Sequence, residues 1–285
     1  MYNLGRMVRD MLAEILADLP LGPLYYFNSI GSTNAEALNL AREGAPHLTL
    51  VVADEQTAGR GRSKRRWFTP PGRALAFSLV LRPESLPFAA DPAGKDDGSS
   101  DFTRLTAAGA LAVAAALETL YGLEAQIKWP NDVLVGGRKL SGVLVEADWQ
   151  GQELSSAVLG IGINVARDSE PPAVELLYPA TSVEAVLGRS VDRWVLLRAV
   201  IGTLLDWLHR LDGPEFLQAW EARLAYRGQP VRVLQDSGAA LEGELLGLEA
   251  DGALLLRLPT GAVIRVLAGD VRLRPAGVDN QENRE

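Results

Sequence analysis

The chain has 285 residues, a net charge of -8, two histidines and no cysteine. Its length suits one large domain, or a large domain with a small companion. Without cysteine it can form no disulfide framework, thiolate zinc site or cysteine nucleophile, and a reducing cytoplasm is the expected compartment. His47 and His209 are the only imidazoles, so a histidine-rich metal centre and a Ser/His/Asp triad both have few candidates.

The first part of the chain alternates expected helices and strands. Residues 1–23 place charged and apolar residues at helical spacing and lack the apolar core of a signal peptide, so they predict an amphipathic helix. A second helix should begin at Thr33, because Thr33 and Glu36 have the spacing of a capping box. The apolar runs that predict strands here are 24–30, 48–55 and 74–82.

The middle of the chain continues this mixed α/β pattern. Residues 83–101 have the composition of a flexible surface insertion, and residues 102–121 predict a long helix that is too short in apolar length to span a membrane. Gly136 and Gly137 lie between two alternating runs and predict a β-hairpin. A second capping box, Thr181 with Glu184, opens a helical region. The remaining expected strands are 124–129 and 153–165, and the remaining expected helices are 193–211 and 214–224.

From about Gly228 the pattern changes to short alternating runs separated by Gly, Asp and Ser. Runs of that length and spacing predict a small antiparallel barrel of about 50 residues. Residues 276–285 are polar and should form a frayed tail. We therefore expect a catalytic domain over residues 1–226 and a barrel over residues 227–275.

The charge is unevenly distributed. Residues 56–82 contain no Asp or Glu and seven cations, so the rest of the chain carries -15 (-8 minus 7). A cluster of one sign that is rich in Arg and Gly suits a compact anion such as a phosphate or carboxylate, although an exposed basic loop is the alternative. The acidic overall balance argues against a protein that coats nucleic acid. The seven cations are Arg60, Arg62, Lys64, Arg65, Arg66, Arg73 and Arg82.

Three short segments set polar residues among glycines beside apolar strands: 59–67, 128–142 and 160–164. None matches the phosphate-binding P-loop or the three-glycine dinucleotide fingerprint. Glycines let a ligand approach the backbone closely, and arginines offer guanidinium forks to carboxylate and phosphate oxygens. These segments therefore predict an anion site of another type.

Taken together, the ordered motifs resemble those of the biotin protein ligase family. The resemblance implies an α/β (α+β) catalytic domain of the class II synthetase and biotin/lipoate ligase type, followed by a small SH3-like antiparallel β-barrel. One departure is that the family's loop usually reads GRGRxG, whereas this chain has Ser63 and Lys64 after the second arginine. The motifs that carry the resemblance are STN (32–34), EQTAGRGR (55–62), KWPND (128–132), RKLSGVLVE (138–146) and GIGINV (160–165).

The resemblance implies a reaction in two steps. Biotin attacks the α-phosphate of Mg-ATP to give biotinyl-5'-AMP and pyrophosphate, and a lysine of a biotin carboxyl carrier domain then attacks the mixed anhydride. Biotin and ATP are the expected ligands, and Mg²⁺ is expected with ATP, with no protein ligand assigned to it. We expect no DNA partner, because only about 25 residues precede the first strand, fewer than the roughly 60 of a winged helix-turn-helix domain. We expect no membrane partner, because the most apolar stretch, residues 105–117, is too short to span a bilayer. An exposed sheet edge would permit a homodimer.

The resemblance also implies residue roles. Arg60 and Arg62 should hold the carboxylate and α-phosphate together. Lys139 should neutralise charge growing on the α-phosphate, and Asp132 should hydrogen-bond the incoming lysine. Trp67 should pack on adenine or on the ordered loop. The expected biotin-binding residues are Ser32, Thr33, Asn34, Gln56, Gly59, Arg60, Arg62 and Lys139. The expected ATP- and adenylate-binding residues are Arg62, Arg65, Trp67, Lys128, Asn131, Asp132, Lys139 and Asn164.

Simpler roles compete with these assignments. The STN segment can be a helix cap, Asp132 a turn residue, and the glycines of 160–164 a means of close strand packing. A lipoate or octanoate ligase or transferase on the same fold is the nearest alternative activity. A biotin-binding sensor without catalysis and a nucleic-acid-binding protein are alternatives from other classes.

Overall fold

The computed structural model describes residues 2–63, 65–87, 99–151, 153–171, 178–235, 240–267 and 271–275. The expected surface insertion falls largely, and the expected frayed tail entirely, outside these described residues. The helices are α1 (Tyr2–Ile15), α2 (Thr33–Arg42), η1 (Pro83–Ser85), α3 (Ser99–Tyr121), α4 (Val183–Leu187), α5 (Arg193–Leu208) and α6 (Pro214–Ala222).

The larger sheet has seven strands in the order β1-β2-β3-β7-β6-β5-β4. Strands β1 and β2 are parallel, and every other neighbouring pair is antiparallel. The sheet is therefore mixed, in agreement with the expected α+β catalytic domain. Its strands are β1 (Leu24–Phe27), β2 (Leu50–Ala53), β3 (Ala74–Leu81), β4 (Ala125–Lys128), β5 (Asp132–Val135), β6 (Arg138–Gln150) and β7 (Glu153–Asn164).

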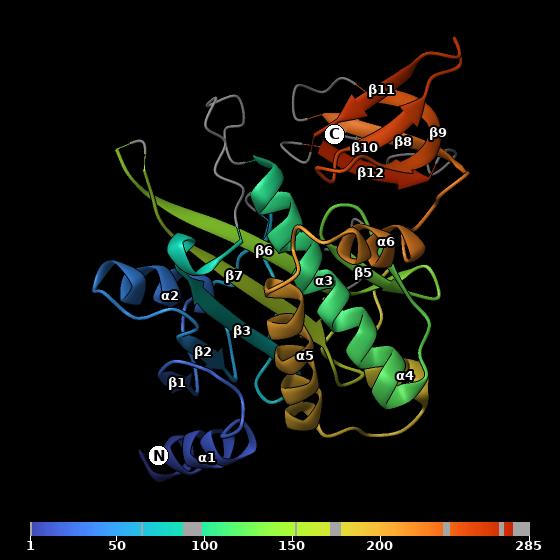
Figure 1. Ribbon diagram of the computed structural model, residues 1–285. Helices are drawn as coiled ribbons and strands as arrows, with labels where there is room; N and C mark the ends of the chain where they lie inside the picture. The colour runs from blue at the N-terminus through green and yellow to red at the C-terminus, as the bar shows by residue number, and fades with distance from the viewer. Residues whose placement is uncertain are drawn as a thin grey trace, which may run out of the picture.

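Both faces of the central strands are buried. In β2, Leu50 and Val52 belong to the main core with α3 and α5, whereas Val51 packs with α2. Successive side chains of a strand point to opposite faces, so α2 covers one face and α3 and α5 cover the other. Figure 1 shows α3 and α5 side by side across one face of the sheet.

The β5–β6 hairpin has the expected Gly136-Gly137 turn. Both glycines have positive φ, 56° and 71°, as a two-residue hairpin turn of the primed type requires. The hairpin places the start of β5 beside Gly142 of β6. The sequence pattern therefore predicted this part of the fold correctly.

The C-terminal domain is a five-stranded antiparallel sheet in the order β11-β10-β9-β8-β12. It confirms the small antiparallel domain that the alternating runs predicted, which the family resemblance implied to be SH3-like. Apolar side chains of β8, β9, β10 and β11 are buried inside it, and Figure 1 shows it next to α6 and the β5 region. The strands are β8 (Pro230–Gln235), β9 (Ala240–Leu248), β10 (Leu254–Arg257), β11 (Val263–Val266) and β12 (Val271–Pro275).

The segment before the C-terminal domain runs along the edge strand β4. Ile127 N donates a hydrogen bond to Arg223 O over 2.7 Å, and Ala225 N donates to Ile127 O over 2.9 Å. The chain thus covers part of the sheet edge before it enters the small domain.

Both capping-box predictions are wrong. The N-cap of α2 is Ser32 and that of α4 is Ser182, and neither makes a side-chain capping hydrogen bond. Thr33 instead turns its hydroxyl toward Ser78, and Glu184 accepts a hydrogen bond from Val191 N over 3.1 Å. Within the described ranges, no helix has both the length and the apolar character required to cross a bilayer.

Candidate active site

The candidate site lies on the α2 face of the larger sheet, over a floor of glycines. Gly142 of β6 pairs with Gly162 of β7, and Gly160 precedes it on the same strand. A Cβ atom on Gly162 would lie 2.3 Å from Trp67 Cε2, and one on Gly160 would lie 1.8 Å from Asn34 Oδ1. Real Cβ atoms do not approach so closely, so only glycine lets the Trp67 ring and the Asn34 amide rest on the strands.

A cavity of about 120 Å³ opens above this floor. Three segments that are distant in the sequence form its walls: the STN segment with Gln56, the Gly/Arg loop, and the KWPND segment with Lys139. The residues expected at the site that line the cavity are Ser32, Thr33, Asn34, Gln56, Arg60, Arg62, Arg65, Trp67, Lys128, Asn131, Asp132 and Lys139.

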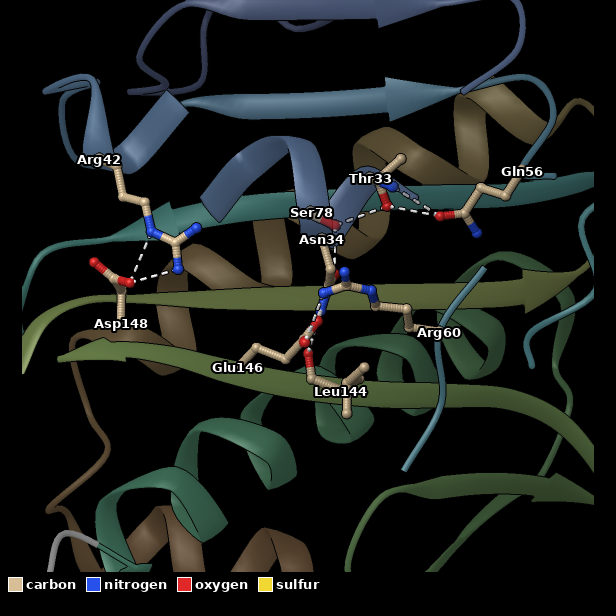
Figure 2. Close-up of polar contacts among 9 residues, drawn as sticks. All are labelled: Thr33, Asn34, Arg42, Gln56, Arg60, Ser78, Leu144, Glu146 and Asp148. Carbon is tan, nitrogen blue, oxygen red and sulfur yellow. Dashed lines mark hydrogen bonds and ion pairs between the residues drawn. The ribbon is translucent and has the colours of Figure 1, made fainter. Parts of the chain in front are cut away.

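The STN segment is held by side-chain hydrogen bonds rather than by capping (Figure 2). Gln56 Oε1 accepts a hydrogen bond from Thr33 N over 2.9 Å, and its Nε2 donates to Thr69 Oγ1 over 3.0 Å. The Asn34 amide is bonded at both ends, to Ser78 Oγ over 2.6 Å and to Glu146 Oε2 over 2.9 Å. These bonds fix the orientation of both amide groups.

The Gly/Arg loop is a small hairpin over the cavity. Gly61 N donates to Arg65 O over 2.8 Å, and Trp67 N donates to Gly59 O over 3.0 Å. Ser63 has a φ of 52°, which is the left-handed region that favours glycine. A serine thus adopts a glycine-like backbone conformation next to the position where this loop departs from the family pattern.

Two arginines tie this loop to the strands around it. Arg62 Nη1 donates to Asn131 Oδ1 over 3.3 Å, and Arg60 Nη1 forms an ion pair with Glu146 Oε1 at 3.0 Å. Arg60 therefore reaches β6, and Arg62 reaches the KWPND segment. Both arginines remain part of the cavity wall.

Asp132 is a buried carboxylate between two lysines. Its Oδ1 lies 2.6 Å from Lys139 Nζ, and its Oδ2 lies 3.3 Å from Lys128 Nζ. Burial would raise the pKa of Asp132, but the charges and hydrogen bonds of Lys139 and Lys128 outweigh burial and lower this pKa below its ordinary value. Asp132 is therefore ionised at neutral pH and holds both ammonium groups at the cavity wall.

The cavity carries excess positive charge. Six of its lining residues are basic and one is acidic. A partly enclosed wall with this excess of positive charge attracts an anionic ligand, so the geometry suits carboxylate and phosphate groups. The basic residues are Arg60, Arg62, Arg65, Arg66, Lys128 and Lys139, and the acidic residue is Asp132.

Two expected site residues lie outside the cavity wall. At Gly59 the backbone is approached closely by the protein itself rather than by a ligand, because a Cβ atom there would lie 2.3 Å from Trp67 O. Asn164 is buried and donates through Nδ2 to Thr181 O over 3.0 Å. Trp67 packs over Gly162 and Gly142 of the sheet and lines the cavity.

The cations of the basic segment 56–82 do not all lie at the cavity. Arg73 forms an ion pair with Asp168 at 3.4 Å, and Arg82 donates to the carbonyl oxygens of Ala41, Ala45 and Ser155. Neither arginine lines the cavity, and Lys64 lies outside the described residues. Four of the seven cations therefore line the cavity.

Glu146 and Ser78 belong to the site's hydrogen-bond network, although sequence reasoning assigned them no role. Ser78 is the one polar residue of the apolar strand β3, and Glu146 ends the motif 138–146. Those two signals were present in the sequence. The sequence did not show that both of them contact Asn34, because Asn34 is 44 residues from Ser78 and 112 residues from Glu146 along the chain.

The fold and the cavity define an α/β ligand-binding domain of the synthetase type with a small β domain appended. The model of the biotin/lipoate A/B protein ligase family matches residues 26–164, and the model of the biotin protein ligase C-terminal domain matches residues 227–274. The chain belongs to the biotin/lipoate A/B protein ligase family.

Individual relatives agree with this membership. The biotin–[acetyl-CoA-carboxylase] ligase of Paracoccus denitrificans is 38% identical over 236 residues, which cover 81% of this chain and 92% of that protein. The bifunctional ligase/repressor BirA of Bacillus spizizenii is 34% identical over 254 residues, covering 88% and 74%. The biotin protein ligase of Aquifex aeolicus, solved in complex with biotin and ATP, superposes with a TM-score of 0.74 at 29% identity, covering 89% of this chain and 99% of that one.

Proposed function

We propose that this protein is a biotin protein ligase. It activates biotin with ATP to biotinyl-5'-AMP and pyrophosphate, and transfers the biotinyl group to a lysine of a biotin carboxyl carrier domain, with formation of an amide and release of AMP. The observation that carries the proposal is the cationic cavity over the glycine floor, built from the STN, GRGR and KWPND segments together. The similar Aquifex aeolicus structure holds biotin and ATP.

The first step needs two anions to meet. The biotin carboxylate must approach the α-phosphate, and their repulsion opposes this approach. Arg62 and Lys139 both line the cavity, so their charges offset that repulsion and stabilise the negative charge that grows on the phosphate. Asp132 keeps Lys139 in place at 2.6 Å, so little reorganisation is needed during the reaction.

The second step needs a hydrogen-bond acceptor that orients the incoming lysine amine. Asp132 is ionised, lines the cavity and is our choice for hydrogen-bonding the carrier lysine. The Gly/Arg loop shields the adenylate from water while the acceptor approaches. Ser32 Oγ is a buried hydroxyl of the cavity wall and is the proposed partner of a polar group on biotin, with Thr33 and Gln56 beside it.

The remaining parts of the proposal concern partners and organisation. Mg²⁺ enters with ATP and is held mainly by phosphate oxygens and water, because the described residues contain no group of three or more acidic or histidine side chains that could hold a metal ion. Strand β6 pairs with β5 only as far as Gly142, but it pairs with β7 as far as Gln150. The β5 side of β6 is therefore an open edge beyond Gly142, where a second copy of the chain could add. We place the catalytic domain at 1–226, the barrel at 227–275 and the protein in the cytoplasm.

The decisive experiment measures pyrophosphate release from the purified protein with Mg-ATP and biotin, lipoate, octanoate or no acid. Release with biotin alone is the expected result. Release with lipoate or octanoate instead would move the activity to their ligases. Binding of biotin without release would identify a sensor.

The matched variants for this assay are Arg62→Ala and Arg42→Ala. Arg42 forms an ion pair with Asp148 on the same face of the sheet but does not line the cavity. Arg62→Ala should abolish adenylate formation with the fold intact, whereas Arg42→Ala should retain it. Near-normal release by Arg62→Ala would refute the assignment of the loop.

A further inference from the structure

A continuous chain of polar side chains leads from the sheet core to the Gly/Arg loop. Its inner end is Ser78 of β3, which is 0% exposed and donates through Oγ to Asn34 Oδ1 over 2.6 Å. Asn34 Nδ2 donates to Glu146 Oε2 over 2.9 Å and to Leu144 O over 3.3 Å. Figure 2 shows these side chains on the α2 face, with Glu146 reaching from β6 toward Asn34 and Arg60.

The outer end of the chain is Arg60. Its Nη1 lies 3.0 Å from Glu146 Oε1, and its side chain is 47% exposed against 26% for Glu146. Arg60 lines the cavity and Glu146 does not. Glu146 can therefore influence a bound ligand only through its side-chain partners Arg60 and Asn34, which both line the cavity, and of these only Arg60 carries the positive charge that an anion needs.

Only a carboxylate satisfies both neighbours of Glu146. The Asn34 amide nitrogen and the Arg60 guanidinium are both donors, and a carboxylate accepts at both oxygens. A glutamine of the same shape would turn its own NH₂ group toward one of these donors and lose that contact. The negative charge also strengthens the bond to the guanidinium.

We propose that Glu146 is a positioning residue of the adenylation site, which holds Arg60 ready to bind the anionic group of the acid substrate. This inference rests on the proposed function. Glu146 uses one nitrogen of a guanidinium that has five N–H donors in a planar fork, so the remaining donors serve the ligand carboxylate. Because Asn34 fixes Glu146, the STN segment contributes to anion binding without touching the anion.

The same strand supplies a matched control. Two residues further along β6, Asp148 accepts from Arg42 Nε and Nη2 over 2.8 and 2.6 Å. This is also an arginine–carboxylate pair on the α2 face, but it lies away from the cavity lining. An exposed ion pair contributes little to stability in general, so a purely structural role predicts that Glu146→Gln and Asp148→Asn behave alike.

The test measures biotin-dependent pyrophosphate release by the full-length protein carrying Glu146→Gln, Asp148→Asn, Arg60→Ala, or Arg60→Ala with Glu146→Gln. We expect Glu146→Gln to raise the KM for biotin about tenfold, or about 1.4 kcal/mol, with a smaller change in kcat and a melting temperature close to that of the wild type. Asp148→Asn should match the wild type. Glu146→Gln should add nothing in the Arg60→Ala background, because both changes remove the same interaction.

Two results would overturn the inference while leaving the proposed function in place. One is a KM for Glu146→Gln equal to that of Asp148→Asn, and the other is an effect that adds fully to that of Arg60→Ala, as a general folding defect would. Failure of the wild type to release pyrophosphate with biotin would instead refute the proposed function, and this inference with it.

Discussion

The indole nitrogen of Trp129 donates a hydrogen bond of 3.0 Å to the carbonyl oxygen of Gly252 and thereby links the two domains. Trp129 belongs to the KWPND segment and is 1% exposed, and Gly252 precedes β10 of the C-terminal domain. Arg104 of α3 makes a parallel link, donating to Ala250 O over 2.7 Å. The small domain therefore helps to hold in place the segment that contributes Lys128, Asn131 and Asp132 to the cavity.

Trp129→Phe should weaken both stability and catalysis. The variant keeps an aromatic ring but leaves the buried Gly252 carbonyl without this donor, at a cost of about 1–3 kcal/mol. A less firmly held KWPND segment should also lower kcat for pyrophosphate release. Urea unfolding and the release assay measure the two effects, with the half-exposed Trp149→Phe as control. Wild-type kcat in Trp129→Phe would show that the domains are coupled in stability alone.

The paired Asp132 should make stability depend on pH in the acid range. Its pKa is lowered in the folded state because, despite burial, Lys139 and Lys128 favour the charged form. The unfolded chain therefore takes up this proton first, at about pH 4. The stabilisation is complete above that pH and is lost as the pH falls from there toward the folded pKa.

Asp132→Asn tests this prediction. Removing one member of a buried ionic cluster leaves the lysines without their counter-charge and should cost about 3 kcal/mol at pH 7. Urea titrations should show the difference from wild type shrinking below about pH 4. Asp168→Asn is the control, because its carboxylate is 62% exposed. A constant difference from pH 7 to pH 3 would contradict the assigned ionisation.

Gly162→Ala should lower activity strongly and stability moderately, because it displaces a side chain of the cavity wall. The new methyl group would lie 2.3 Å from Trp67 Cε2, so the indole must leave its place over the strand. We expect at least a tenfold loss of kcat/KM for biotin in the release assay, and a loss of stability of about 1–3 kcal/mol. Adding Trp67→Ala should recover part of the stability but not the activity. Wild-type kcat/KM in Gly162→Ala would show that the Trp67 ring has no part in the site.

Local pattern was sufficient for much of this molecule. The alternating apolar runs predicted the C-terminal strands, and Gly136-Gly137 predicted the hairpin, because each depends on neighbours a few residues away. The order of motifs likewise predicted the basic residues that line the cavity. The strand and hairpin signals are each confined to one short segment, whereas the motif order extends over residues 32–165.

The two wrong capping boxes, and the contacts that the sequence did not predict, have a different physical origin. Ser32 and Thr33 are both good N-caps, and only the tertiary hydrogen bonds to Gln56 and Ser78 decide that Thr33 lies inside the helix. Asn164 ends a strand that borders the cavity, yet its amide bonds to Thr181. The place of Glu146 depends on strand register and on a helix 112 residues away in sequence, which no local pattern contains.

Replacing glycine by alanine should raise the stability of the protein in helix α5 and lower it in helix α3. Gly202 lies within α5, where an added Cβ atom would meet only Leu19 Cδ2, at 3.9 Å. Gly109 lies within α3, where an added Cβ atom would lie 2.8 Å from Val143 Cγ1. Both positions carry the entropic cost of glycine in a helix, but only the first has room for a methyl group.

Gly202→Ala should therefore stabilise the protein by about 0.5–1 kcal/mol, which raises the melting temperature by roughly 1–4 °C in a chain of this size. Gly109→Ala should destabilise it by about 1–3 kcal/mol, because α3 or the β6 side chain must move outward. Thermal unfolding of both variants measures the difference. Equal gains would mean that α3 can shift on the sheet without cost, whereas equal losses would mean that α5 packs more tightly around Gly202 than its single neighbouring atom indicates.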